Sequence, residues 1–132
     1  MSELSLLPDS PEILLVIADD ELRGALADLL RVDGFATRHA RAVDDVPARL
    51  SPRPVAMIVD ASLGRSDEAG VHGLLDRLAR ARHGVPTVLV SAKPGLAAKA
   101  RAYGFGCVEI PFGRYALKSE IARVRKVGAR RG

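Results

Sequence analysis

The chain has 132 residues, of which 48% are hydrophobic and 27% are charged, and its formal net charge at pH 7 is +4. These values are ordinary for one soluble globular domain with a sizeable core, and no run of residues is long and apolar enough to suggest a membrane span. The single cysteine, Cys107, excludes an internal disulfide and a cysteine-based metal site. We expect a cytoplasmic protein without membrane contacts.

The two ends of the chain are expected to lie outside the folded domain, which we place at residues 12–127. Residues 1–11 have neither the basic start nor the apolar core of a signal peptide, and they are interpreted as a flexible arm. Residues 128–132 are interpreted as a basic tail, which in a longer protein would lead to an output domain. No base-reading pattern accompanies this charge, so nucleic-acid binding is not expected through this domain alone.

The first third of the chain predicts two strands around one helix. Residues 12–18 (EILLVIA) form an apolar run typical of a buried strand. Residues 21–34 have leucines at helical spacing, and Gly34 is a suitable stop for the helix. Residues 35–40 (FATRHA) predict a weaker second strand.

The middle of the chain predicts a short helix, a strand and a long loop. Asp44 and Asp45 are interpreted as N-caps of a helix that continues to residue 50. Residues 55–59 (VAMIV) are apolar throughout and predict a third strand. Residues 60–70 (DASLGRSDEAG) have the small and polar composition of a loop.

The last part of the chain repeats the alternation of helix and strand. Residues 71–84 predict a helix and residues 86–90 a fourth strand that ends at Ser91. A short helix is expected within residues 93–104, followed by a fifth strand at 107–110. Residues 114–127 predict a final amphipathic helix.

Strands that alternate with helices and are apolar throughout indicate a parallel sheet covered on both faces. Right-handed crossovers leave few topologies for such a chain. We therefore predict a flavodoxin-like, doubly wound α/β fold with five parallel strands in the order 2-1-3-4-5 and helices on both faces.

Polar side chains follow three of the predicted strands at the point where each strand ends. Asp19 and Asp20 follow the first strand, Asp60 follows the third, and Ser91 follows the fourth. Because the carboxyl ends of parallel strands meet at one edge, these groups are expected to converge in a crevice. Such an oxygen-rich pocket suits Mg²⁺, and its chemistry would be phosphoryl transfer to the Asp60 carboxylate.

With these residues in place, the sequence resembles the receiver domain of two-component response regulators. The resemblance covers residues 12 to about 127 and depends on four motifs in register: LLVIADDE, MIVD, TVLVSAK and IPF. It implies that Asp60 is the phosphoacceptor, that Asp19 and Asp20 hold Mg²⁺ together with Asp60, and that Ser91 is the switch hydroxyl.

The motifs depart from the receiver pattern at the last strand. Receivers usually have a lysine before the proline, and Ile110 occupies that position here. Lys93 is a candidate substitute cation because it lies just past Ser91, although a solvent-exposed loop lysine is the simpler interpretation. The aromatic residue of the switch is also missing, and Cys107 is nearest its place.

The acidic pair can be aligned in two ways. The motif IADD favours Asp19 and Asp20 as the pair, with a loop before the first helix that is two residues shorter than is typical. The leucine spacing of the helix favours a gapless match that puts Ile17 and Ala18 at the acid positions. Asp60 alone would be a poor Mg²⁺ site, so metal binding would be very weak under the second alignment.

The sequence supports two main functional hypotheses. In the first, a histidine kinase or phosphotransfer protein phosphorylates Asp60, and the domain signals to a downstream protein. In the second, an atypical receiver works as a protein-binding module without phosphorylation. A second copy of the chain is a further candidate partner. A flavin- or nucleotide-using enzyme is disfavoured because DDEL would repel a phosphate, and turnover of an external substrate is not expected.

Overall fold

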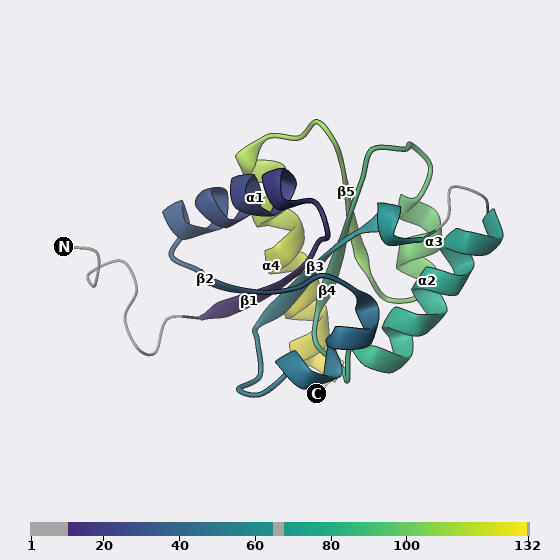
Figure 1. Cartoon of the computed structure of the whole chain (residues 1–132), viewed down its shortest axis with the longest axis horizontal. Coiled ribbons are helices and arrows are strands. Elements are labelled where there is room, and N and C mark those ends of the chain that lie inside the picture. Colours follow the sequence, from purple (N-terminus) through teal and green to yellow (C-terminus); the bar gives the residue numbers. More distant parts are fainter. Residues whose placement is uncertain (1–10, 65–67, 132) are drawn as a thin grey trace.

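The computed structural model describes residues 11–64 and 68–131, which form five parallel strands in the order β2-β1-β3-β4-β5 (Figure 1). The strands are β1 (Glu12–Val16), β2 (Ala36–Ala40), β3 (Ala56–Asp60), β4 (Thr87–Ser91) and β5 (Gly106–Glu109). The α-helices are α1 (Asp20–Val32), α2 (Glu68–Ala81), α3 (Ala97–Ala102) and α4 (Arg114–Arg131). The described residues also form three 3₁₀ turns: η2 (Val43–Asp45), η3 (Pro47–Arg49) and η4 (Ala61–Leu63). The predicted sheet order is confirmed.

The central strands are buried on both faces, as their apolar composition predicts. Every residue of β3 and β4 is buried, and so are the last four residues of β1. Side chains alternate between the two faces of a strand, so the core is divided in two. Leu15 and Ile58 belong to one cluster, and Leu14 and Met57 belong to the other.

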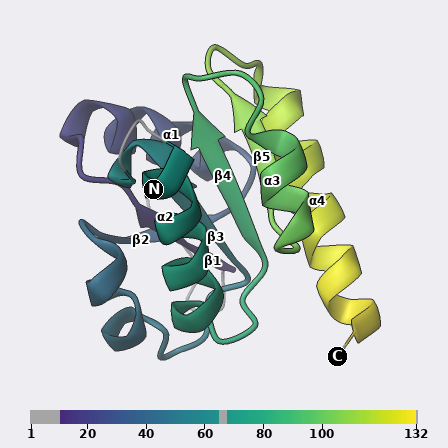
Figure 2. The same cartoon turned by 90° about the vertical axis from the view of Figure 1, so that its right-hand side faces the viewer.

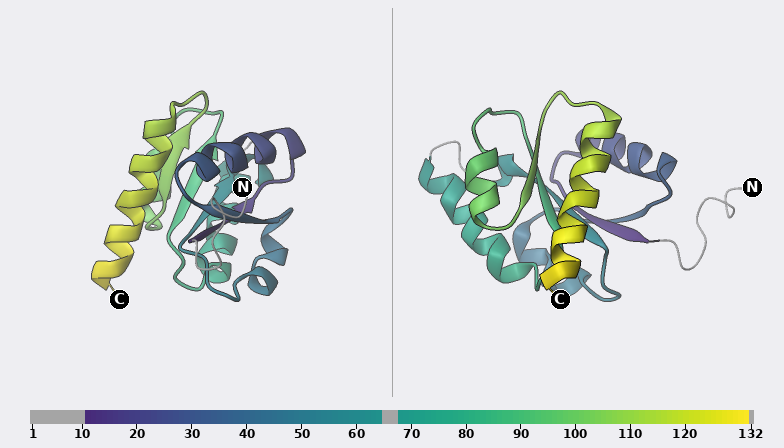
Figure 3. Two further views of the ribbon diagram at one scale, coloured as in Figure 1. Left: turned by 90° about the vertical axis from the view of Figure 1, so that its left-hand side faces the viewer. Right: turned by 180° about the vertical axis from the view of Figure 1, so that it is seen from behind.

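The helices cover the two faces in pairs, as the doubly wound topology requires. Buried leucines of α1 and α4 pack with the cluster of Leu15 and Ile58. Buried residues of α2, α3 and η2 pack with the cluster of Leu14 and Met57. Figure 2 shows α2 and α3 in front of the sheet, and Figure 3 shows α1 and α4 on its other side.

The prediction of a helix over residues 44–50 is wrong. This segment forms the two 3₁₀ turns η2 and η3, with bonds from Val46 N to Val43 O and from Arg49 N to Val46 O. Pro47 has no N–H to donate to Val43 O, so the turn that begins at Val43 cannot extend through Pro47 with regular α-helical bonds. Asp44 and Asp45 are not N-caps, because they lie inside η2, which is preceded by Ala42.

Helix ends differ from their predicted positions by a few residues. Gly34 ends α1 as predicted, with φ of +90° and a bond from its N–H to Arg31 O. Helix α2 begins at Glu68, earlier than the predicted Val71, and α4 continues to Arg131. Most of the predicted N-terminal arm (residues 1–10), part of the loop (65–67) and residue 132 lie outside the described residues. The domain boundaries stay a prediction.

A carboxylate from α4 accepts a hydrogen bond from the backbone of the edge strand β5. Glu120 Oε2 accepts a hydrogen bond from Cys107 N–H at 2.8 Å, and Arg123 holds the same carboxylate with two bonds of 2.9 Å. Gly106 leaves room for this contact, because a Cβ there would lie 2.8 Å from Glu120 Oε2. An unpaired N–H of an edge strand is therefore satisfied within the chain.

Replacing this carboxylate should make stability depend less on pH. The Arg123 hydrogen bond holds the pKa of Glu120 below its ordinary value. Ionised Glu120 therefore stabilises the fold above its unfolded-state pKa of about 4.3, and this contribution is lost as pH falls through the lower folded-state pKa. Because the ion pair is partly exposed, Glu120→Gln should reduce the free energy of unfolding by about 0.5–1 kcal/mol at pH 7.

Urea unfolding at pH 7 and at decreasing acidic pH measures this effect. The difference between the original chain and Glu120→Gln should shrink as pH falls. Glu109→Gln, at an exposed position at the end of the same strand, serves as the control and should change stability by less than about 0.5 kcal/mol at pH 7. A difference for Glu120→Gln that stays constant across the pH range would contradict the assigned role.

Candidate functional site

Asp60 lies at the carboxyl end of the central strand β3, as predicted. Its side chain is nearly buried, with the residue 9% exposed. Oδ1 accepts a hydrogen bond of 2.9 Å from Ser62 N–H, so the carboxylate caps the 3₁₀ turn η4. Asp60 therefore has a structural role in addition to its position at the edge of the sheet.

Ser91 ends the neighbouring strand β4, and its hydroxyl is used within its own loop. The hydroxyl donates to Lys93 O at 2.9 Å and accepts from Lys93 N–H at 3.0 Å. Asp60 pairs with Val90 in the β3–β4 register, so Ser91 lies one residue farther along its strand. The two predicted site residues thus share one edge of the sheet, and the hydrogen bonds of Ser91 are with the backbone of Lys93.

The first strand ends before the acidic motif. Strand β1 ends at Val16, and Ile17 continues the ladder with a bond from its N–H to Ala40 O. Ile17 and Ala18 are the two residues directly past the strand. Asp19 follows as the N-cap of α1, where its Oδ1 accepts from Glu21 N–H at 3.0 Å.

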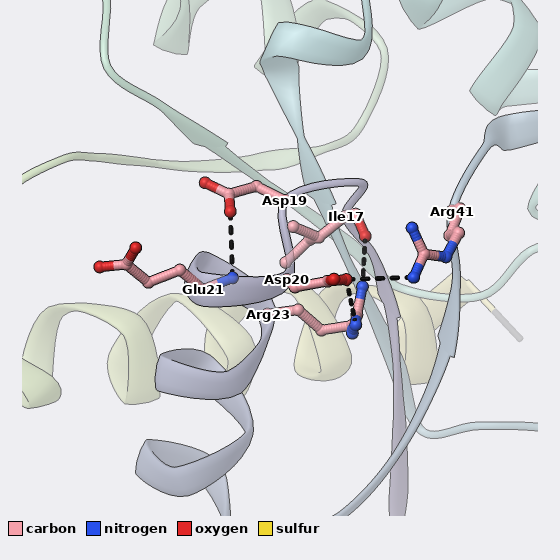
Figure 4. A network of polar contacts seen from close by, with 6 residues as sticks. All are labelled: Ile17, Asp19, Asp20, Glu21, Arg23 and Arg41. Carbon is pink, nitrogen blue, oxygen red and sulfur yellow. Dashed lines mark hydrogen bonds and ion pairs between the residues drawn. The ribbon is translucent and has the colours of Figure 1, made fainter.

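Asp20, the first residue of α1, belongs to an ionic network that the sequence reading did not identify (Figure 4). Its Oδ1 lies 2.5 Å from Arg23 Nη2 and 3.1 Å from Arg41 Nη2. Arg23 also donates from Nη1 to Ile17 O at 3.3 Å. The hydrogen bond from Arg23, followed by the charge of Arg41, holds the pKa of Asp20 below its ordinary value.

Only half of this network is visible in the sequence. Asp20 and Arg23 have the i, i+3 spacing of a helical ion pair, which was an available signal. Arg41 follows β2 and reaches Asp20 only because β2 and β1 are neighbours in the sheet. The network occupies the start of α1 with two guanidinium groups around one exposed carboxylate.

A cavity of about 490 Å³ lies beside this edge, between η4, α2 and the loop from β4 to α3. Its lining includes Ser91 and Lys93 of the predicted site, together with Ser62, Val71 and Lys99, which the sequence reading did not single out. Asp60 is not among its lining residues. The cavity therefore shares Ser91 and Lys93 with the predicted phosphorylation site and does not include Asp60 in its lining.

Solved structures of response regulators are similar to this architecture. NtrX from Brucella abortus is 25% identical with a TM-score of 0.73, over 92% of this chain and 28% of that one. A putative response regulator from Chloroflexus aurantiacus is 21% identical with a TM-score of 0.71, over 89% and 99% of the two chains. The receiver protein from Burkholderia phymatum is 24% identical with a TM-score of 0.67, over 88% and 95%. The chain has the receiver fold.

The similarity lies in the structure. No protein-family model matches the sequence, and no curated protein matches it at a significant level. The chain spans 28% of the length of NtrX, whereas it spans nearly all of the Chloroflexus and Burkholderia proteins. Within the part of the chain that the structure describes, no helix is long and apolar enough to cross a membrane.

The side chains of this receiver fold do not fit a Mg²⁺ site. Among residues 11–64 and 68–131, no group of three or more His, Cys, Asp or Glu side chains could hold a metal ion. Asp19 caps a helix, and Asp20 is paired with Arg23 and Arg41. Ile17 and Ala18, directly past β1, supply no carboxylate. In this structure Asp19, Asp20 and Asp60 are therefore not arranged around one metal position, in contrast to the prediction.

The last strand offers no cation in the usual receiver position. Ile110 is 37% exposed, and its N–H donates to Ser91 O at 2.7 Å, so this backbone contact ties the end of β5 to β4. Its side chain has no group that could bind a phosphoryl oxygen. Cys107, near the place of the missing aromatic residue, is partly buried, and burial raises the pKa of its thiol to about 11.

The capping role of Asp19 gives a direct prediction. Asp19→Ala should lower the free energy of unfolding by about 1 kcal/mol, whereas Asp19→Asn should keep most of the stability because an amide oxygen can also cap a helix. Thermal or urea unfolding in metal-free buffer checks both variants. Asp28→Ala, at an exposed position within α1, is the control and should cost less than about 0.5 kcal/mol. Equal losses for Asp19→Asn and Asp19→Ala would contradict the capping role.

Proposed function

We propose that this chain is a receiver-type signalling module that works through protein–protein contacts and does not require Mg²⁺-dependent phosphorylation of Asp60. One observation carries the proposal: no carboxylate cluster accompanies Asp60 in the described part of the chain. The receiver fold of its structural neighbours supports the signalling role in general terms. Receiver domains are generally non-enzymatic modules, and no turnover of an external substrate is proposed.

Phosphoryl transfer to a carboxylate depends on positive charge around the transferring group. The transferred phosphoryl carries charge on its oxygens, and a metal ion and fixed cations neutralise it. Ile17 and Ala18 provide no metal ligand past β1, and Ile110 provides no cation past β5. One lost charge-assisted hydrogen bond costs about 1.5–3 kcal/mol, or roughly 10- to 150-fold in an equilibrium or rate. Several such losses together disfavour phosphorylation.

A phosphorelay receiver is the second candidate, because Asp60 ends the central strand beside Ser91. In this alternative Asp60 is the phosphoacceptor, Ser91 is the switch hydroxyl, and Lys93 is the substitute cation. Asp19 and Asp20 would have to leave their present partners to hold Mg²⁺ with Asp60. The phosphoryl donor would be a histidine kinase or phosphotransfer protein.

Both candidates need a protein partner to receive the signal. The downstream partner, or a second copy of this chain, would bind an outer surface of the domain. The two candidates differ in whether a phosphoryl group on Asp60 changes that binding. In the favoured candidate the domain has the same affinity for its partner whatever the state of Asp60.

Intact-mass spectrometry after incubation with acetyl phosphate and excess Mg²⁺ separates the two candidates. We expect no gain of about 80 Da, the mass of one phosphoryl group that replaces a proton. A receiver with an intact acid pair and lysine, treated in parallel, provides the positive control for the phosphodonor. A gain of that mass which Asp60→Asn abolishes would overturn the proposal and favour the phosphorelay.

A further inference from the structure

The cavity beside the β4–α3 loop includes Ser91 and Lys93 of the candidate site in its lining, but neither proposed function assigns a ligand to it. We propose that it binds a small organic anion: a carboxylate with an aromatic or aliphatic body. The cavity volume of about 490 Å³ lies within the range of small-molecule sites in proteins. This inference depends on the walls of the cavity and does not require a phosphoryl group on Asp60.

Apolar and small groups form most of the cavity wall. Val71 of α2 and Leu96, just before α3, supply aliphatic surface, and Pro94 adds a ring from the loop between them. Leu96 is nearly buried, so it offers a fixed surface and not a mobile side chain. An aromatic or aliphatic body of a ligand would remove this surface from water, which favours binding.

The lining of the cavity also includes positively charged side chains. Lys93 from the loop and Lys99 from α3 both line the cavity. Among the described residues that line it, none is acidic: the others are Ala61, Ser62, Gly64, Val71, Ser91, Ala92, Pro94, Gly95 and Leu96. Two ammonium groups beside an apolar surface favour an anionic head on an apolar body. A carboxylate could exchange with the contacts that each lysine already makes.

The local backbone explains why the cavity is open. Helix α3 begins only at Ala97, so residues 92–96 form a loop outside the helix. Gly95 has φ of +89°, a conformation that a glycine adopts without strain. Both hydrogen bonds of the Ser91 hydroxyl fix the backbone of Lys93 at the start of this loop. The loop therefore has a defined path around the cavity, with a polar anchor at one end.

A polar residue of η4 also lines the cavity and can orient a bound ligand. Ser62 lies in η4, and its N–H is held by the Asp60 carboxylate. This bond fixes the turn that presents the Ser62 residue to the cavity. Asp60 itself is not among the residues that line the cavity. A small number of polar groups around an apolar space is typical of ligand sites.

Naphthalene-2-carboxylate is a suitable probe, and naphthalene-2-carboxamide is its neutral counterpart. Titration of each into ¹⁵N-labelled full chain, followed by amide chemical shifts, gives the location and affinity of binding. The carboxylate should shift the amides of Ser62, Val71, Lys93, Gly95 and Lys99 in a saturable way. The carboxamide should bind at least about fivefold more weakly, because it lacks the charge.

Three variants test the residues that define the site. Lys93→Gln and Lys99→Gln should each weaken carboxylate binding by about threefold to tenfold and leave carboxamide binding nearly unchanged. Val71→Phe should fill part of the cavity and weaken both probes. Lys118→Gln, at an exposed position on α4, is the matched control and should leave both affinities unchanged. The amide spectrum of each variant without ligand shows whether it is folded.

The titrations can contradict the inference in three ways. Absence of saturable shifts at these amides with millimolar naphthalene-2-carboxylate would overturn the site itself. Equal affinity for the carboxylate and the carboxamide, or unchanged carboxylate affinity in both lysine variants, would overturn the assignment of an anionic ligand. Shifts scattered over the surface, and equally affected by Lys118→Gln, would indicate nonspecific binding and would also overturn it.

Discussion

The burial of β1, β3 and β4 on both faces is the constraint on which this structure depends. Each strand contributes apolar side chains to two separate clusters, so a helix layer must cover each face. Parallel strands joined by covering segments then bring their carboxyl ends to one edge. Asp60 and Ser91 are neighbours at this edge for that reason, although 31 positions separate their numbers in the sequence.

The polar groups at this edge are mainly satisfied by local contacts. Asp19 and Asp60 each cap a following helix or turn, and Asp20 pairs with Arg23 and Arg41. The hydroxyl of Ser91 closes a turn on its own loop. Such contacts stabilise the connections that leave the sheet, and they leave no set of oxygen ligands around a common point in the described residues. The edge therefore retains the receiver architecture, and in the described residues its carboxylates and hydroxyl are bonded to nearby groups.

The sequence predicted the fold well because long apolar runs and helical spacing report burial directly. Right-handed crossovers left few topologies, the flavodoxin-like order chosen among them is the order of the sheet, and each predicted strand has its counterpart there. The site was less predictable, because a shift of two residues decides whether an aspartate faces a metal or caps a helix. Asp19 and Asp20 show this sensitivity, and Arg41 shows that an ion partner can come from a neighbouring strand. Around Pro47, the structure has two 3₁₀ turns where the sequence predicted an α-helix.

The most direct test of the central claim is a Mn²⁺ titration followed by NMR of the ¹⁵N-labelled chain. Mn²⁺ takes the same oxygen ligands as Mg²⁺ and broadens the amide signals near its binding site. If the edge lacks a divalent metal site, substoichiometric Mn²⁺ should not selectively broaden the amides of residues 60–62. Selective broadening there, reversed by excess Mg²⁺ and absent in Asp60→Asn, would contradict the account.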